Sequence, residues 1–163
     1  MTDLELPFPF SLIFEYFWLL TIVFAIISIP IFKARVNQYI QQDPSLEGGY
    51  NKLILGYVLF IIIPWLVMGV GILFGKLDTF FDVIYGLRTW EPFSVLFFGT
   101  IIALMILACI WVWFWGGAEF LVKHHGILNR AEESTTLIKI RFAVIMAASI
   151  MAPFLFLNGI LRF

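Results

Sequence analysis

Four long apolar stretches constrain the fold of this chain more than any other feature. They cover residues 10–32, 53–75, 93–117 and 142–161, and the only formal charge within them is that of Glu15. A transmembrane α-helix needs roughly 20 apolar residues to cross about 30 Å of hydrocarbon. Each stretch reaches that length, so the sequence predicts four transmembrane helices.

The composition supports a membrane environment for the whole chain. Hydrophobic residues make up 62 % of it and charged residues 13 %, whereas soluble domains contain about 45–50 % apolar and about 25 % charged residues. Lipid must therefore solvate most of the surface, and the backbone polar groups must be paired within helices. We expect one all-α transmembrane domain over residues 1–163, with two helical hairpins packed as a four-helix bundle.

The distribution of cations predicts the orientation of these helices. The segments between stretches one and two and between stretches three and four hold seven of the ten Lys and Arg residues. Cytoplasmic loops of membrane proteins are enriched in Lys and Arg. Both segments are therefore expected in the cytoplasm and both termini outside, in a multi-pass protein of a plasma membrane or bacterial inner membrane.

The connecting segments carry helix and turn signals. The first helix is expected to extend through Gln42 and to turn at residues 43–45, where Asp-Pro-Ser favours a turn. Leu77, Phe80, Phe81 and Ile84 recur at helical spacing, which predicts a short interfacial helix between the second and third spans. The third helix is expected to continue to Val122, beyond the length that a bilayer needs.

Glu15 is the most informative polar residue. A carboxylate at the centre of a bilayer costs on the order of 2.5–3.5 kcal/mol and usually faces a cavity or a partner group. Glu15 is therefore a candidate proton- or cation-coupling group. The alternative is that it lies one to two turns inside the boundary and reaches headgroups or water near the positive end of the helix dipole.

Two prolines are candidate kink sites. A proline inside a helix leaves a carbonyl without its usual N–H donor, so Pro64 and Pro153 could border a polar pathway. The alternative is that both simply bend helices that pack against their neighbours.

A polar cluster is expected at the cytoplasmic side of the third helix. It consists of Glu119, His124, His125, Arg130, Glu132 and Glu133. These residues could form a ligand or metal site, or Glu119 could simply pair with Lys123 one helical turn later. The two adjacent histidines diverge by about 100° on a helix, and the chain has no His-x-x-x-His pair, so a shared metal is disfavoured.

Small residues spaced four apart are candidate helix-packing sites, because they let helix backbones approach closely. Three such pairs occur, Gly71 with Gly75, Gly99 with Ala103, and Ala143 with Ala147. Their partner could be another helix of this chain or another subunit.

The sequence predicts no catalytic residues, no cofactor, no bound metal and no nucleic-acid partner. Cys109 lies in an apolar stretch, where its thiol stays protonated, and the chain has no polybasic run. The leading functional hypothesis is a non-catalytic accessory or assembly subunit that packs with itself or with other membrane subunits. The alternatives are a small oligomeric transporter or channel that uses Glu15, and a membrane enzyme or lipid-binding protein with a cytoplasmic-side polar site.

Overall fold

The computed structural model describes residues 10–127 and 134–157, and every regular element within them is helical, as predicted. The elements are α1 (Phe10–Glu15), α2 (Phe17–Gln42), the 3-10 helix η1 (Pro44–Leu46), α3 (Glu47–Leu73), α4 (Phe80–Gly86), α5 (Pro92–Phe114), α6 (Gly117–Lys123) and α7 (Thr135–Leu157). Among the described residues, three stretches are long and apolar enough to cross a membrane, Phe17–Gln42, Pro44–Leu73 and Pro92–Phe114. The fourth predicted span, residues 142–161, lies partly outside the described residues.

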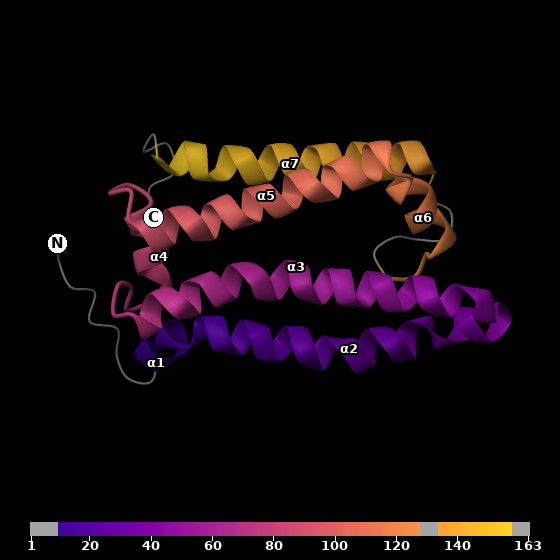
Figure 1. The fold of residues 1–163 in the computed structure, drawn as a ribbon, viewed down its shortest axis with the longest axis horizontal. Helices are drawn as coiled ribbons and strands as arrows, with labels where there is room; N and C mark the ends of the chain where they lie inside the picture. Colours follow the sequence, from indigo (N-terminus) through magenta and orange to yellow (C-terminus); the bar gives the residue numbers. More distant parts are fainter. Residues whose placement is uncertain (1–9, 128–133, 158–163) are drawn as a thin grey trace.

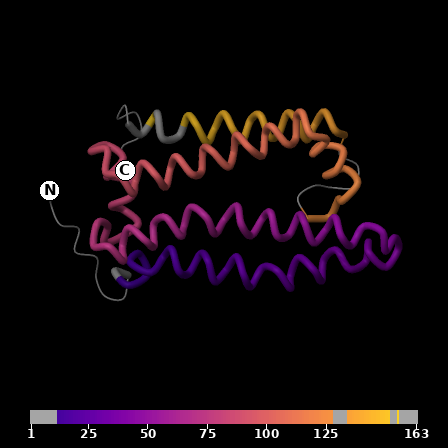
Figure 2. The backbone as a smooth tube through the Cα atoms, viewed as in Figure 1, coloured from indigo at the N-terminus to yellow at the C-terminus, as the bar shows by residue number. Residues whose placement is uncertain are grey.

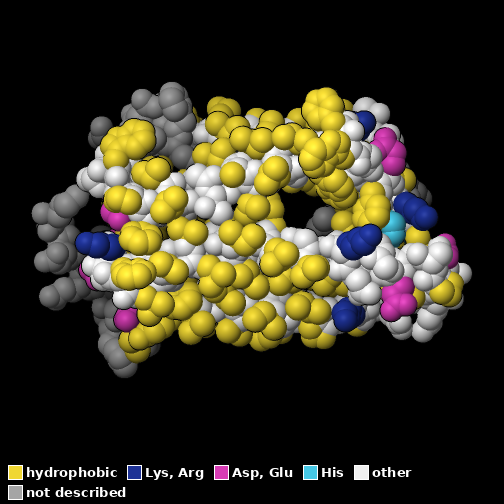
Figure 3. Space-filling view, viewed as in Figure 1, with side chains coloured by type: hydrophobic (Ala, Val, Ile, Leu, Met, Phe, Trp, Pro, Cys, Tyr) yellow, Lys and Arg dark blue, Asp and Glu magenta, His cyan; other side chains and the backbone are white. Residues whose placement is uncertain are grey.

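The four longest helices, α2, α3, α5 and α7, lie side by side and alternate in direction (Figures 1 and 2). The main contacts join consecutive members of this row, α2 with α3, α3 with α5, and α5 with α7. Helices α1 and α4 lie at one end of the row, and η1 and α6 lie at the other. Figure 3 shows charged side chains gathered at these two ends and a hydrophobic belt between them.

The first long helix is interrupted near its start, whereas the sequence predicts one continuous helix. Tyr16 (φ −94°, ψ 13°) separates α1 from α2. As predicted, α2 ends at Gln42, where Asp43 adopts an extended conformation and Pro44 opens η1. The Asp43 carboxylate accepts the N–H of Ser45 at 3.0 Å. Hydrogen bonds from the Ser45 side chain and backbone lower the pKa of Asp43.

Helix α3 ends in a Schellman motif at Gly75. The N–H of Lys76 donates to the carbonyl of Gly71 at 3.0 Å, and the N–H of Gly75 donates to the carbonyl of Ile72 at 2.9 Å. Gly75 has a φ of +63°, which favours glycine because it has no Cβ. The chain can therefore turn sharply from α3 toward α4.

The predicted short helix between the second and third spans is present as α4. Its start is fixed by a capping box, in which the Asp82 carboxylate accepts the backbone N–H of Thr79 at 2.6 Å. Val83 of α4 and the preceding Leu77 are buried. Helix α4 therefore covers one end of the helix row.

The third long helix is shorter than predicted. Helix α5 stops at Phe114, and Gly116 (φ +72°) starts a separate helix, α6. A Cβ at Gly117 would lie 2.6 Å from the Trp111 ring, so α6 folds back closely against the end of α5. Gly116 adopts a left-handed conformation, which glycine allows at little cost. Gly117 has no Cβ and can therefore lie close to Trp111. Together the two glycines separate α5 from α6.

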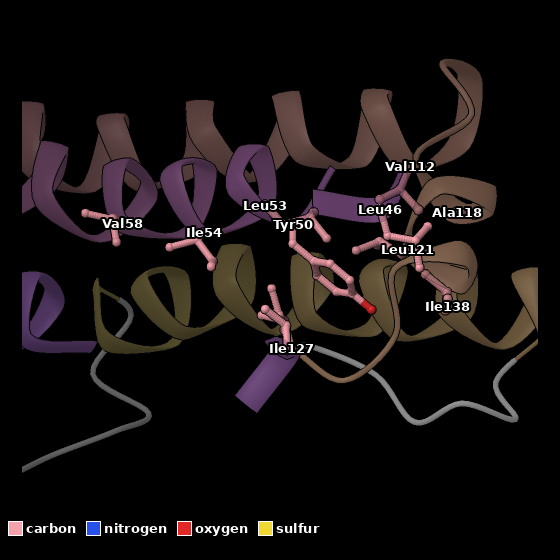
Figure 4. Close-up of a cluster of buried hydrophobic side chains, with 11 residues drawn as sticks. Leu46, Tyr50, Leu53, Ile54, Val58, Val112, Ala118, Leu121, Ile127 and Ile138 are labelled. Atoms are coloured by element: carbon pink, nitrogen blue, oxygen red, sulfur yellow. The ribbon is translucent and has the colours of Figure 1, made fainter. Parts of the chain in front are cut away.

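Two buried clusters hold the row together. The larger one lies toward the η1 and α6 end, and Figure 4 shows Tyr50 of α3 extending among its members. The smaller one lies toward α4 and contains Met68, Leu77, Val83 and Phe97. Both clusters join α3 to α5 and to the short helices, so each end of the row is packed.

Candidate functional site

The candidate site is an apolar pocket of about 750 Å³ between α3 and α5. Helices α3 and α5 lie farther apart toward the α6 end (Figure 1), and the space-filling view is hollowed in this region (Figure 3). Its wall includes Lys52, Gly56 and Phe60 of α3 and Leu104 and Trp111 of α5. Phe120 of α6 and Phe142 of α7 complete it.

Three side chains of the pocket wall carry polar atoms, namely Lys52, Tyr57 and Trp111. Lys52 is exposed and has no described carboxylate as an ion-pair partner. The Tyr57 ring packs edge-to-face against Phe32 of α2, with 4.9 Å between ring centroids. The pocket therefore combines a mainly aliphatic and aromatic wall with a single cation.

His124 of the predicted polar cluster is buried, with 4 % of its surface exposed. Its ring stacks on Phe120 at 4.2 Å, and its Nδ1 lies 2.8 Å from the Phe120 carbonyl oxygen. The ring lies so close to Gly49 of α3 that a Cβ there would overlap its Nε2 atom. Nδ1 is therefore hydrogen-bonded within α6, and the Nε2 edge of the ring packs against α3 at Gly49.

His125 is held by aromatic contacts on α2 and α3. Its ring packs edge-to-face against Tyr39 at 4.7 Å, and its backbone carbonyl accepts the Tyr50 hydroxyl hydrogen at 2.8 Å. Gly126 (φ +100°) follows, and a Cβ there would overlap the Tyr39 ring. The segment after α6 therefore packs against Tyr39 of α2 and is hydrogen-bonded to Tyr50 of α3.

The other members of the predicted cluster do not join the histidines within the described part of the chain. Glu119 is exposed, and its Oε1 lies 3.9 Å from Nζ of Lys139 on α7. The expected pairing with Lys123 is replaced by this contact. Arg130, Glu132 and Glu133 lie outside the described residues. Among the residues described, no group of three His, Cys, Asp or Glu side chains could hold a metal ion.

Glu15 lies at the last residue of α1, next to the break at Tyr16. Its side chain is partly exposed, and it is not part of the pocket wall. Figure 1 places α1 at the α4 end of the row, opposite the end where α3 begins. Lys52 of the pocket wall lies near that beginning of α3, in its second turn. The structure therefore separates the candidate coupling residue from the pocket.

The two prolines lie inside long helices. Pro64 is buried within α3, four residues beyond Phe60 of the pocket wall, and does not itself line the pocket. Pro153 lies within α7, and its side chain is outside the described part.

The predicted small-residue pairs have different surroundings. Gly71 is buried, and a Cβ there would lie 2.7 Å from Cδ1 of Leu77, whereas Gly75 caps α3. Gly99 and Ala103 are both exposed on α5, and a Cβ at Gly99 would meet no atom within 4 Å. On α7, Ala143 is partly buried and Ala147 is exposed.

Sequence reasoning missed the pocket, although one signal was present. Lys52, Gly56 and Phe60 recur every four residues, so they lie on one helix face. No sequence pattern indicates that this face meets α5 across a gap. The aromatic residues Tyr39 and Tyr50, which fasten the histidines, were missed for the same reason.

No protein-family model, curated protein or solved structure matches this chain. The fold and the pocket define the class of protein by themselves. Within residues 10–127 and 134–157, all regular structure is helical, three helices are long and apolar enough to cross a membrane, and an apolar pocket lies between α3 and α5.

Proposed function

We propose that this protein is a non-catalytic accessory or assembly subunit that binds a partner within the membrane through the outer face of α5. The partner is a second copy of the chain or another membrane subunit. The observation that supports this proposal most is a pair of small residues, Gly99 and Ala103, on α5, a helix that could span the bilayer. Both are exposed, and no other part of the described chain packs against Gly99. We call this pair the α5 ridge.

The ridge belongs to a continuous exposed stripe on α5. Leu96, Gly99, Ala103 and Leu107 follow one another at helical spacing, and all four are exposed. Helices in lipid associate mainly through close packing, because lipid tails are as apolar as leucine. Because Gly99 and Ala103 are small and lie between two leucines, a second helix could approach the backbone of α5 at this ridge. This stripe is therefore a better docking face than the bulky surface around Phe24 on α2.

The arrangement of the described polar residues favours binding over chemistry. His124 and His125 are engaged by Phe120, Gly49 and Tyr39, and Glu119 pairs with Lys139. Glu15, on which a transport function would depend, is not part of the pocket wall. These observations support a subunit rather than an enzyme or a Glu15-coupled transporter.

The proposed topology has four spans, with α7 as the fourth, in a plasma or bacterial inner membrane. Among the described residues, the η1 and α6 end has six Lys and Arg residues and three Asp and Glu residues. The α4 end has two Lys and Arg residues and four Asp and Glu residues. Because cations accumulate on the cytoplasmic side, the η1 and α6 end is proposed to face the cytoplasm and both termini the outside.

Photo-crosslinking in native membranes tests the proposed partner. A photoreactive phenylalanine analogue is placed at Ala103 on the ridge and, as a matched control, at Phe24 on an exposed face of α2. The position at Ala103 is expected to give a discrete crosslinked product of protein mass, and the position at Phe24 is expected to react mainly with lipid. Lipid products alone at both positions would refute the proposal.

A further inference from the structure

The pocket between α3 and α5 has the dimensions of a ligand site. Its volume of about 750 Å³ lies within the roughly 300–1,000 Å³ range of ligand pockets. Lys52 and Phe60 are eight residues apart on α3, which corresponds to about 12 Å along the helix axis. The pocket is therefore elongated along the helix, with its cation at one end.

We propose that this pocket binds an anionic membrane lipid, with one acyl chain along α3 and the headgroup phosphate beside Lys52. The aliphatic and aromatic wall offers few polar partners to water, so an acyl chain is a better occupant than water. A transmembrane helix is about 10–12 Å across and about 30 Å long, so its volume is far larger than a pocket of about 750 Å³ can hold.

The charge around the pocket favours an anionic headgroup over a neutral one. Lys52 is exposed and has no described ion-pair partner, so its ammonium group is available to a phosphate. The described residues at this end, six cationic and three acidic, carry a net charge of +3. The pocket wall also includes Trp111. Tryptophan is enriched at the level of the lipid headgroups in membrane proteins.

Gly56 provides a direct way to block the pocket. It lines the pocket, and a Cβ at this position would meet no atom within 4 Å. The side chain of a Gly56→Leu variant therefore enters open space, and leucine favours a helix more than glycine does. Gly48→Leu is the matched control, because Gly48 is also an uncrowded glycine of α3 but lies outside the pocket.

Native mass spectrometry of the purified full chain, titrated with dioleoyl phosphatidylglycerol or dioleoyl phosphatidylcholine, measures the proposed binding. The wild type and Gly48→Leu are expected to retain one phosphatidylglycerol more tightly than phosphatidylcholine. Gly56→Leu is expected to weaken phosphatidylglycerol binding about tenfold or more, because leucine occupies the space of the acyl chain.

The Lys52→Gln variant tests the headgroup contact separately. Phosphatidylglycerol binding is expected to fall about fivefold, the change expected from one lysine near a membrane surface, with phosphatidylcholine binding unchanged. Lys76→Gln, which removes an exposed cation at the opposite end, is the control. Equal retention of both lipids by the wild type would overturn the proposal, as would unchanged binding in folded Gly56→Leu. Neither result bears on the α5 ridge, so this proposal and the proposed function fail separately.

Discussion

The imidazole ring of His124 lies directly against the backbone of Gly49, so the end of α6 is fastened to the first turn of α3. The ring is buried and stacks on Phe120 on its other side. Phe120, on which His124 stacks, forms part of the wall of the pocket between α3 and α5. The shape of the pocket therefore depends on a glycine that no polar or catalytic motif marks.

Gly49→Ala is expected to lower the stability of the protein by about 1–3 kcal/mol, the usual cost of overpacking a filled site. The added methyl group overlaps His124, which has no room to move. Gly48→Ala is the matched control, because a Cβ at Gly48 meets nothing within 4 Å. The measurement is the midpoint of thermal unfolding in detergent. A double variant with His124→Ala should recover part of the loss, and equal midpoints for the Gly48 and Gly49 variants would contradict the contact.

Metal binding by the two histidines is expected to be absent. Nδ1 of His124 is within hydrogen-bond distance of the Phe120 carbonyl, and Nε2 faces Gly49, so neither nitrogen can reach an ion without unpacking α6. Elemental analysis should give the same metal content for the wild type, His124→Ala and His125→Ala. A stoichiometric metal that is lost in either variant would show that this end of the protein rearranges to bind it.

Gly69→Ala is expected to destabilise the contact between α2 and α3. A Cβ at Gly69 would lie 2.5 Å from the Trp18 ring, whose buried Nε1 has no hydrogen-bond partner among the described residues. The expected loss is again about 1–3 kcal/mol, measured by thermal unfolding. Gly56→Ala, on the open pocket side of the same helix, should be neutral or slightly stabilising. A larger loss in Gly56→Ala than in Gly69→Ala would contradict the packing described for α3.

The proposed topology predicts which cysteines a membrane-impermeant maleimide can reach. In a Cys109→Ala background, Thr89→Cys at the α4 end should be labelled in intact cells, whereas Ser45→Cys at the η1 turn should be labelled only after lysis. Both native side chains are exposed. The reverse pattern would invert the topology, and labelling of both positions in intact cells would place both ends outside.

Much of the fold could be predicted because apolar length and turn residues are local signals. The end of α2 at Gln42 followed from Asp43 and Pro44, and α4 followed from the spacing of its apolar residues. The breaks at Tyr16 and Gly116 were not predicted, because both residues lie inside long apolar stretches, 10–32 and 93–117, that each read as one helix. Whether an apolar helix stops depends on tertiary contacts, such as that of Gly117 with Trp111.

The candidate site was harder to predict than the fold. The sequence prediction took polar residues within apolar stretches as the candidate site residues. In the structure, Glu15 lies outside the pocket wall, and His124 packs against Gly49. The pocket is formed mainly by apolar side chains that look like those of any spanning helix. Its position depends on how α3 and α5 diverge, which no local pattern in the sequence encodes.

The oligomeric state in mild detergent tests the proposed function most directly. Size-exclusion chromatography with light scattering, and peptide identification of co-eluting polypeptides, should be applied to the wild type, Gly99→Leu and Gly56→Leu. The wild type and Gly56→Leu are expected to elute as a stable complex with a second copy or another polypeptide, and Gly99→Leu as a monomer. A wild-type protein that is monomeric and free of other polypeptides would contradict the proposed partner-binding role of α5.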